Sequence, residues 1–127
     1  MQLEKVHCLV VEDNAQTTRL IRMMLMDMHV AEVTTAKDGV EAEEVLESGD
    51  YPIDIILCDW RMPRMTGLEL LKKVRVSHPD MPFLMVTANA DVESIRTAAG
   101  SGVSGYIAKP FSQGQLQKKI EALIGNK

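Results

Sequence analysis

Short apolar runs alternate with longer amphipathic segments along this chain. Four of the runs are almost continuously apolar, which is typical of strands that are buried on both faces of a parallel sheet. A fifth run is weaker and more polar, as expected of an edge strand. The expected strands are 6–11, 31–35 (the edge strand), 53–58, 82–87 and 103–108. Because a helical pattern follows each strand, the sequence predicts an α/β fold with five parallel strands and helices on both faces of the sheet.

The helical segments are marked by apolar residues that recur with the period of one helix face. These stripes are Leu20, Ile21, Met24, Leu25 and Met28; Ala42, Val45 and Leu46; Leu68, Leu71 and Val74; Val92, Ile95 and Ala99; and Leu116, Ile120, Leu123 and Ile124. Ser112 precedes the last stripe and is a residue type that commonly caps helices. The stripes predict packing against the sheet and say nothing about function.

The size and composition are those of one ordinary globular domain, and we expect a single domain over residues 1–127. Hydrophobic residues make up 46% and charged residues 25% of the chain, which argues against disorder. The net charge of −4, without a cluster of Lys or Arg, argues against nucleic-acid and anionic-membrane partners. The N-terminus lacks the order of a signal peptide, and no apolar stretch is long enough to cross a bilayer. We therefore expect a cytoplasmic protein.

The cysteines and histidines give no sign of a site of their own. Cys8 and Cys58 lie inside apolar runs, where a free thiol behaves as a small hydrophobic side chain. The three histidines do not show the spacing of metal ligands. We expect buried structural cysteines and no metal site built on histidine.

The most informative polar residues stand at the ends of apolar runs. Asp59 follows the third expected strand, and Lys109 follows the fifth. Glu12 and Asp13 follow the first. In an open parallel sheet the ligand site lies outside the carboxyl ends of the strands, so residues that are distant in the chain can meet there. Each position alone is weak evidence, because strand-end acids often cap helices, but the four together predict one site.

The chemistry of these residues suits a metal ion and a phosphoryl group. Neighbouring carboxylates repel one another, and a divalent cation relieves that repulsion. Mg²⁺ prefers oxygen ligands and keeps several waters, so one or two carboxylates together with a phosphate suit it. Lys109 supplies a positive charge for phosphoryl oxygens. Thr87, at the end of the fourth expected strand, offers a hydroxyl to the same oxygens.

Four segments resemble the motifs of the receiver domain of two-component response regulators. They are VVEDN at 10–14, CDWRMPRMTG at 58–67, LMVTANA at 84–90 and GYIAKPF at 105–111. The likeness is strongest to CheY-like stand-alone receivers, spans nearly the whole chain and leaves no room for an output domain. It implies a flavodoxin-like sheet with strand order 2-1-3-4-5.

The resemblance implies that Asp59 accepts a phosphoryl group from the histidine of a sensor histidine kinase. Asp13 and Asp59 would hold Mg²⁺ directly, together with the backbone carbonyl of Arg61. Glu12 would act on the metal through a water molecule. A protein of this kind is a signalling switch rather than an enzyme with a separate substrate, because it catalyses only its own phosphoryl transfer and slow autodephosphorylation.

The same resemblance implies a route from the phosphoryl group to the surface. Lys109 and Thr87 would contact the bound group, which adds about −1.5 to −2 charge. Thr87 would move toward that group, and Tyr106 would turn inward to fill the vacated space. The surface of the fourth helix, fifth strand and fifth helix, where CheY-like proteins bind partners, would change as a result. Arg61 and Asn89 occupy the two variable positions that tune phosphoryl lifetime in this family.

Two positions depart from the commoner receiver pattern, and the output is open. Glu12 stands where Asp is usual, and Thr66 stands where many receivers have Asp. One possible output is direct binding of a protein target such as a motor switch, as in chemotaxis. The alternative is a relay that passes the phosphoryl group to a histidine phosphotransfer protein. The CheY-like character favours the first.

Two other classes share parts of this pattern. A flavodoxin-type FMN carrier has the same architecture, but Glu12 and Asp13 would repel the phosphate that its first loop must bind. An aspartyl-phosphate phosphatase also uses a strand-end Asp nucleophile, but it needs a second Asp two residues later, where Arg61 stands. Both fit the sequence less well than a receiver.

Overall fold

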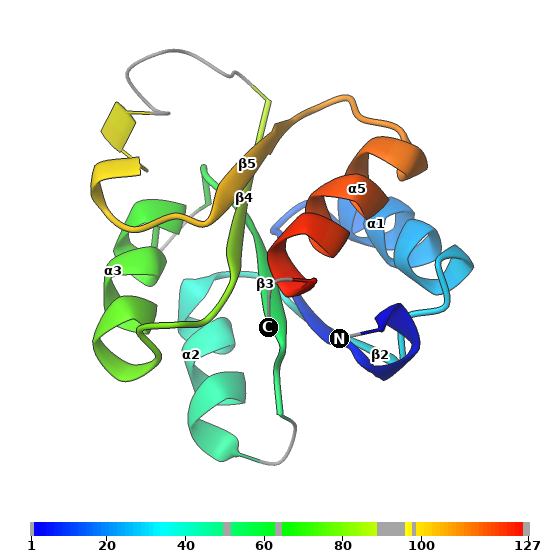
Figure 1. Ribbon diagram of the computed structural model, residues 1–127. Coiled ribbons are helices and arrows are strands. Elements are labelled where there is room, and N and C mark those ends of the chain that lie inside the picture. The colour runs from blue at the N-terminus through cyan, green and yellow to red at the C-terminus, as the bar shows by residue number, and fades with distance from the viewer. Residues whose placement is uncertain (1, 50–51, 63–64, 89–95, 98, 126–127) are drawn as a thin grey trace.

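A computed structural model describes residues 2–49, 52–62, 65–88, 96–97 and 99–125. Its centre is a single sheet of five parallel strands in the order β2-β1-β3-β4-β5 (Figure 1). The strands are β1 (His7–Val11), β2 (Glu32–Ala36), β3 (Ile55–Asp59), β4 (Phe83–Thr87) and β5 (Gly105–Ala108). The predicted fold class and strand order are both confirmed, and the weakest predicted strand does lie at an edge.

Two layers of helices cover the sheet. The helices are α1 (Ala15–Asp27), α2 (Gly39–Ser48), α3 (Gly67–Ser77) and α5 (Gln113–Ile124), and a short 3-10 turn, η1 (Leu3–Lys5), precedes β1. Figure 1 shows α1 and α5 on one face of the sheet and α2 and α3 on the other. Of the stripe predicted between β4 and β5, Val92 and Ile95 lie outside the described residues, and Ala99 is helical. Within the described part of the chain, no helix is long and apolar enough to cross a membrane.

The strands β1, β3 and β4 each supply side chains to two separate cores, because successive residues of a strand point to opposite faces of the sheet. Cys8 and Val10 of β1 pack in the core beneath α1 and α5, whereas Leu9 and Val11 pack in the core beneath α2 and α3. All five residues of β1 are buried, as are those of β4. This burial on both faces explains why these strands appear in the sequence as continuous apolar runs.

The two cysteines are free and buried, as predicted. Burial raises the pKa of the Cys8 thiol to about 12, and the nearby Asp54 carboxylate adds to the effect. Burial also raises the pKa of Cys58, with smaller contributions from the Asp59 and Glu12 charges. Both thiols are therefore protonated near neutral pH and act as core side chains.

The helices α1, α2, α3 and α5 each begin at a polar residue whose side chain accepts a hydrogen bond from the helix's first turn. These N-caps are Asn14, Asp38, Thr66 and Ser112. The prediction for Ser112 is confirmed, and both Thr66 and Ser112 form reciprocal capping boxes. Thr66, one of the two departures from the receiver pattern, therefore has a structural role at the start of α3.

Candidate functional site

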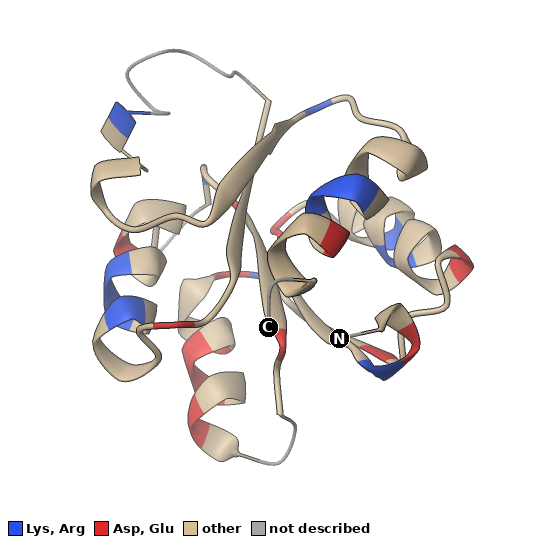
Figure 2. Cartoon of the chain, in the orientation of Figure 1, with Lys and Arg blue, Asp and Glu red and all other residues tan. Residues whose placement is uncertain are grey.

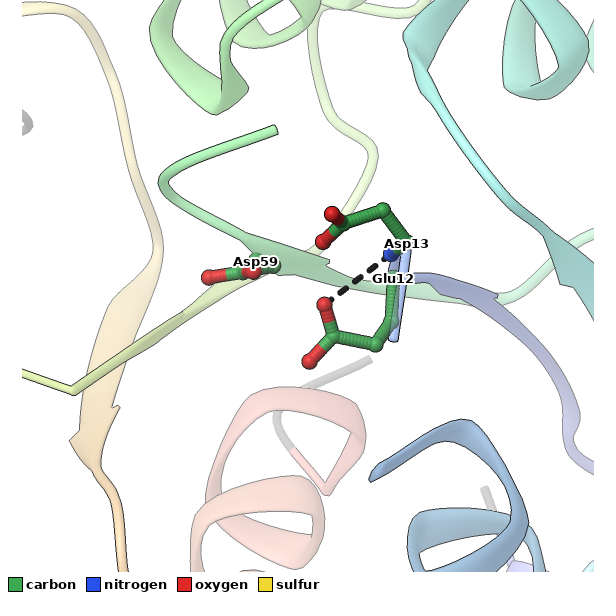
Figure 3. Close-up of side chains that lie close together, drawn as sticks. All are labelled: Glu12, Asp13 and Asp59. Carbon is green, nitrogen blue, oxygen red and sulfur yellow. Dashed lines mark hydrogen bonds between the residues drawn. The ribbon is translucent and has the colours of Figure 1, made fainter. Parts of the chain in front are cut away.

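Three carboxylates converge at the carboxyl end of the sheet. In the pairing of β1 with β3, Val11 lies opposite Cys58, so the residues that follow each of them are neighbours. Oxygens of Glu12, Asp13 and Asp59 all lie within 4.8 Å of one another, and Figure 3 shows the three side chains gathered where these strands end. The structure thus brings together the three acids that the sequence selected.

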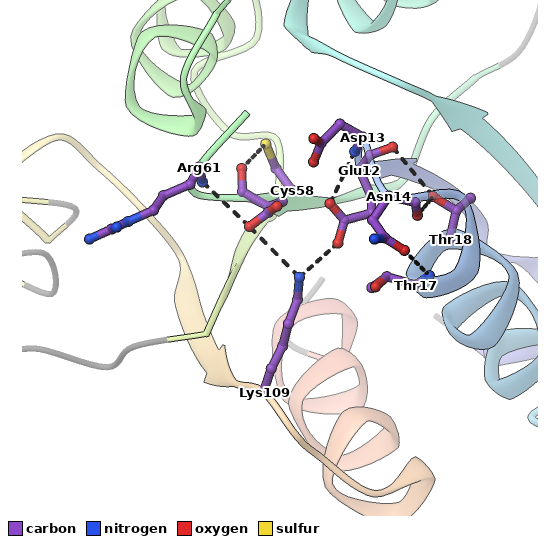
Figure 4. A network of polar contacts seen from close by, with 9 residues as sticks. Glu12, Asp13, Asn14, Thr17, Thr18, Cys58, Arg61 and Lys109 are labelled. Atoms are coloured by element: carbon purple, nitrogen blue, oxygen red, sulfur yellow. Dashed lines mark hydrogen bonds and ion pairs between the residues drawn. The ribbon is translucent and has the colours of Figure 1, made fainter. Parts of the chain in front are cut away.

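Lys109 joins this cluster from the end of β5, the strand at the edge of the sheet opposite β2. Ala108 of β5 lies opposite Thr87 of β4, and the Lys109 amide donates to the Thr87 carbonyl at 2.7 Å. The Lys109 side chain then reaches toward Glu12, as Figure 4 shows. Its Nζ lies 2.7 Å from Glu12 Oε1 and 3.9 Å from Asp59 Oδ1. The ammonium group is therefore bonded to Glu12 and is a looser neighbour of Asp59.

Glu12 is the most buried member of the cluster, with 3% of its surface exposed. Its Oε1 accepts a hydrogen bond from Lys109, and its Oε2 accepts one from the Asp13 amide at 3.0 Å. Burial raises the pKa of Glu12, and the neighbouring Asp59 raises it further, while Lys109 opposes both. Both carboxylate oxygens are thus already bonded within the protein.

Asp13 and Asp59 have more freedom to bind a ligand. Asp13 is exposed and Asp59 is half-buried. Asp59 Oδ1 accepts a long hydrogen bond of 3.4 Å from the Arg61 amide. Three acids against one lysine leave an excess of negative charge, and their oxygens are the hard ligands that Mg²⁺ prefers. The donor set therefore fits Mg²⁺, with Asp13 and Asp59 better placed than Glu12 for direct ligation.

Three other residues were predicted to belong to the site: Thr87, Arg61 and Asn89. Thr87 is buried at the end of β4, beside β3 and β5, so the structure brings it to the same edge of the sheet. The Arg61 side chain is exposed and points away from the three acids in Figure 4. Asn89 lies outside the described residues.

Tyr106 lies on β5 and is not part of the acidic cluster. It is 38% exposed, and the ammonium of Lys119 on α5 lies 5.3 Å from its ring centroid. Its side chain borders a groove of about 470 Å³ between β5 and α5, which Pro110 and Lys118 also line. In this structure the tyrosine therefore stands at the outer surface, next to α5.

Two local features that hold the site were only partly visible in the sequence. Gly67 is the first residue of α3. Its amide donates to the Trp60 carbonyl at 3.0 Å, and a Cβ there would lie 2.7 Å from the Asp59 carbonyl oxygen. Sequence reasoning missed Thr18, whose hydroxyl lies 3.0 Å from the Asn14 carbonyl and 3.3 Å from the Glu12 carbonyl. The only available signal for Thr18 was its place in the first turn after the acidic pair.

Comparison with known proteins agrees with this geometry. Residues 8–121 match the response regulator receiver domain. The chain belongs to this family. The domain is 40% identical over 118 residues to the chemotaxis protein CheY of Pseudomonas aeruginosa, covering 91% of this chain and 94% of the relative. It is 38% identical over 118 residues to CheY-3 of Vibrio cholerae, covering 91% and 89%.

Solved structures show the same fold. The domain superposes on Vibrio cholerae CheY4 with a TM-score of 0.87 and 30% identity, covering 94% of this chain and 98% of that one. It also matches the receiver domain of the sensor histidine kinase PA1611 from Pseudomonas aeruginosa, with a TM-score of 0.83 and 29% identity over 95% and 98% of the chains. That structure has a magnesium ion coordinated in its active-site cleft.

Proposed function

We propose that this receiver domain is a phosphorylation-activated signalling switch in which Asp59 accepts a phosphoryl group from the histidine of a sensor histidine kinase. The observation that carries the proposal is the convergence of Glu12, Asp13 and Asp59 with Lys109 at one edge of the sheet. Asp59 is the half-buried acid of this set that Lys109 approaches without a direct hydrogen bond. Its carboxylate is therefore available as a nucleophile.

The other residues of the cluster have distinct roles in this proposal. Asp13, Asp59 and the backbone carbonyl of Arg61 would hold Mg²⁺, and Glu12 would contribute through water, because both of its oxygens are already engaged. The bound ion would neutralise charge on the acids and on the incoming phosphoryl group. Lys109, which lies between Glu12 and Asp59, then binds a phosphoryl oxygen, and the Thr87 hydroxyl binds another.

Phosphorylation changes the surface that a partner contacts. The new group adds about −1.5 to −2 charge and three acceptor oxygens at the ends of β3, β4 and β5. Thr87 moves toward it, and Tyr106 turns inward from its exposed position on β5. A protein target of the chemotaxis type, such as a motor switch, then binds the surface next to β5 and α5. The relatives named as chemotaxis proteins support this output over a phosphorelay to a histidine phosphotransfer protein.

Trp60 is the only tryptophan and directly follows Asp59, so its fluorescence tests the proposal. The titration adds Mg²⁺ and then beryllofluoride, a mimic of the phosphoryl group. We expect a saturable response to Mg²⁺ and a second response that Asp59→Asn abolishes. Glu44→Gln, at an exposed acid on α2, is the matched control and should behave as wild type. A beryllofluoride response that survives in Asp59→Asn would contradict the assignment of the acceptor.

A further inference from the structure

Arg75, near the end of α3, binds backbone groups from two separate loops. Its Nε donates to the Gly102 carbonyl at 2.8 Å. Its Nη1 donates to the carbonyls of Met81 at 2.7 Å and His78 at 3.3 Å, and its Nη2 donates to Ser104 Oγ at 3.3 Å. A guanidinium can serve four acceptors at once because its five N–H groups are fixed in one plane, whereas a lysine cannot.

The contact between Arg75 and Gly102 is close and sterically specific. Gly102 has a φ of 93°, a backbone conformation in which a residue with a side chain would be strained. A Cβ at this position would lie 3.2 Å from Arg75 Nε. Partial burial lowers the pKa of Arg75, while Asp80 opposes the shift. A partly desolvated cation depends on its hydrogen bonds, so the guanidinium and the Gly102 loop hold each other in place.

Arg75 also reaches the starts of two strands through Ser104. The Ser104 amide donates to the Phe83 carbonyl at 3.0 Å, and its hydroxyl accepts from the Phe83 amide at 2.9 Å. Phe83 begins β4, and Tyr106 follows Ser104 by two residues on β5. Arg75 therefore contacts the residues that lead into β5, the strand that carries Tyr106.

The opposite end of α3 rests on the backbone of the phosphoacceptor. Gly67 begins the helix, and its close approach to the carbonyls of Asp59 and Trp60 leaves no space for a side chain. The helix of 11 residues spans about 16 Å. Figure 1 shows the segment that leads into β5 passing beside α3. One rigid element thus contacts the Asp59 backbone at its start and the entry of β5 near its end.

We propose that Arg75 is a positioning residue that couples α3 to β5, so that a shift of the Asp59 backbone reaches the entry of the Tyr106 strand through α3. This coupling rests on the proposed function and adds a route to the one through Thr87. When Asp59 is phosphorylated, α3 moves with the Asp59–Trp60 backbone, and Arg75 carries the displacement to Gly102 and Ser104.

Hydrogen exchange with and without saturating Mg²⁺ and beryllofluoride tests the coupling. The measured quantity is the fold-change in exchange that beryllofluoride causes in a peptide covering residues 102–108. We expect Arg75→Met and Arg75→Lys to reduce that fold-change by about threefold or more relative to wild type. The control, Lys72→Met at an exposed residue of the same helix, should leave it unchanged.

The Trp60 titration separates failure of this inference from failure of the proposed function. We expect all variants to bind Mg²⁺ and beryllofluoride with midpoints within about twofold of wild type, because Arg75 lies outside the acidic cluster. If Arg75→Met raises exchange equally with and without beryllofluoride, Arg75 is only structural and the coupling is refuted. If wild type itself shows no Trp60 response, the proposed function fails first.

Gly102→Ala perturbs the same contact from the loop side and leaves the arginine in place. Its Cβ would push against the guanidinium, so the beryllofluoride-induced fold-change should fall as it does in Arg75→Met. This variant decides the question if Arg75→Met does not fold. A Gly102→Ala protein with the full wild-type response would refute the coupling.

Discussion

Removing the cation from the Glu12–Lys109 pair gives the sharpest test of how the acidic cluster is held together. In Lys109→Met, the Glu12 carboxylate keeps only the hydrogen bond from the Asp13 amide. Breaking a buried ion pair by removing one partner typically costs about 3–5 kcal/mol. Lys109 is 24% exposed, and Glu12 can take up a proton, so we expect a smaller loss of about 2 kcal/mol at neutral pH.

The loss in Lys109→Met should depend on pH, with a defined sign. Lys109 lowers the pKa of Glu12 against burial and Asp59, so its removal raises the folded-state pKa further above the ordinary value of 4.5. A raised carboxyl pKa means that the folded protein binds the proton more tightly than the unfolded chain does. The destabilisation is therefore smallest at acidic pH, where Glu12 is protonated in both states, and grows as the pH rises through the folded-state pKa.

Urea unfolding of the metal-free protein at several pH values measures this effect. Wild type, Lys109→Met, Glu12→Gln and the double variant form a cycle that isolates the coupling energy of the pair. Lys109→Arg retains the cation and should recover most of the stability. A Lys109→Met protein that is as stable as wild type at neutral pH, or whose loss does not change with pH, would refute the reasoning.

Three further predictions concern separate parts of the domain. Mg²⁺ at about 100 times its Kd should raise the free energy of unfolding by about 2.7 kcal/mol, as measured by urea titration. Asp13→Asn should remove most of this gain, and an equal gain in the variant would exclude Asp13 as a ligand. Arg61→Asn should change the decay rate of the labelled phosphoprotein, because the resemblance to receivers places residue 61 at a position that tunes phosphoryl lifetime. The Arg61 side chain points away from the three acids in this structure, so it must turn toward the phosphoryl group to shield it, and equal decay rates in the two proteins would refute a shielding role. Thr66→Ala should cost about 1 kcal/mol by removing the N-cap of α3, whereas Thr66→Asp, which keeps a capping oxygen, should be nearly neutral in the same unfolding assay.

Most of the fold could be predicted because it depends on local patterns. The sequence predicts the third strand at 53–58, and β3 spans Ile55–Asp59. The strand could be predicted because burial on both faces of the sheet leaves an apolar run in the sequence. The last strand was expected from residue 103 but begins at Gly105. The difference arises because Ser104 caps the start of β4 with its side chain, a contact across 21 residues that no local pattern records.

The residues that meet at the site could be predicted from their places in the chain. Asp59, Glu12 and Lys109 each follow an apolar run, and the carboxyl ends of parallel strands share one edge, so their convergence follows from position in the chain. The strand order was predicted from the resemblance to receivers. Apolar periodicity cannot predict the order, because all buried strands show the same pattern of apolar residues.

The pairing of these residues becomes visible only in the folded protein. Lys109 bonds to Glu12, 97 residues away, rather than to Asp59, because the longer glutamate side chain reaches it across the sheet. Arg75 appeared in the sequence as one more basic residue of an amphipathic helix, yet it bonds to Gly102 and Ser104. Apolar periodicity records which face of an element is buried. It does not record which polar atoms meet across the fold, because those contacts depend on distances that only the folded chain defines.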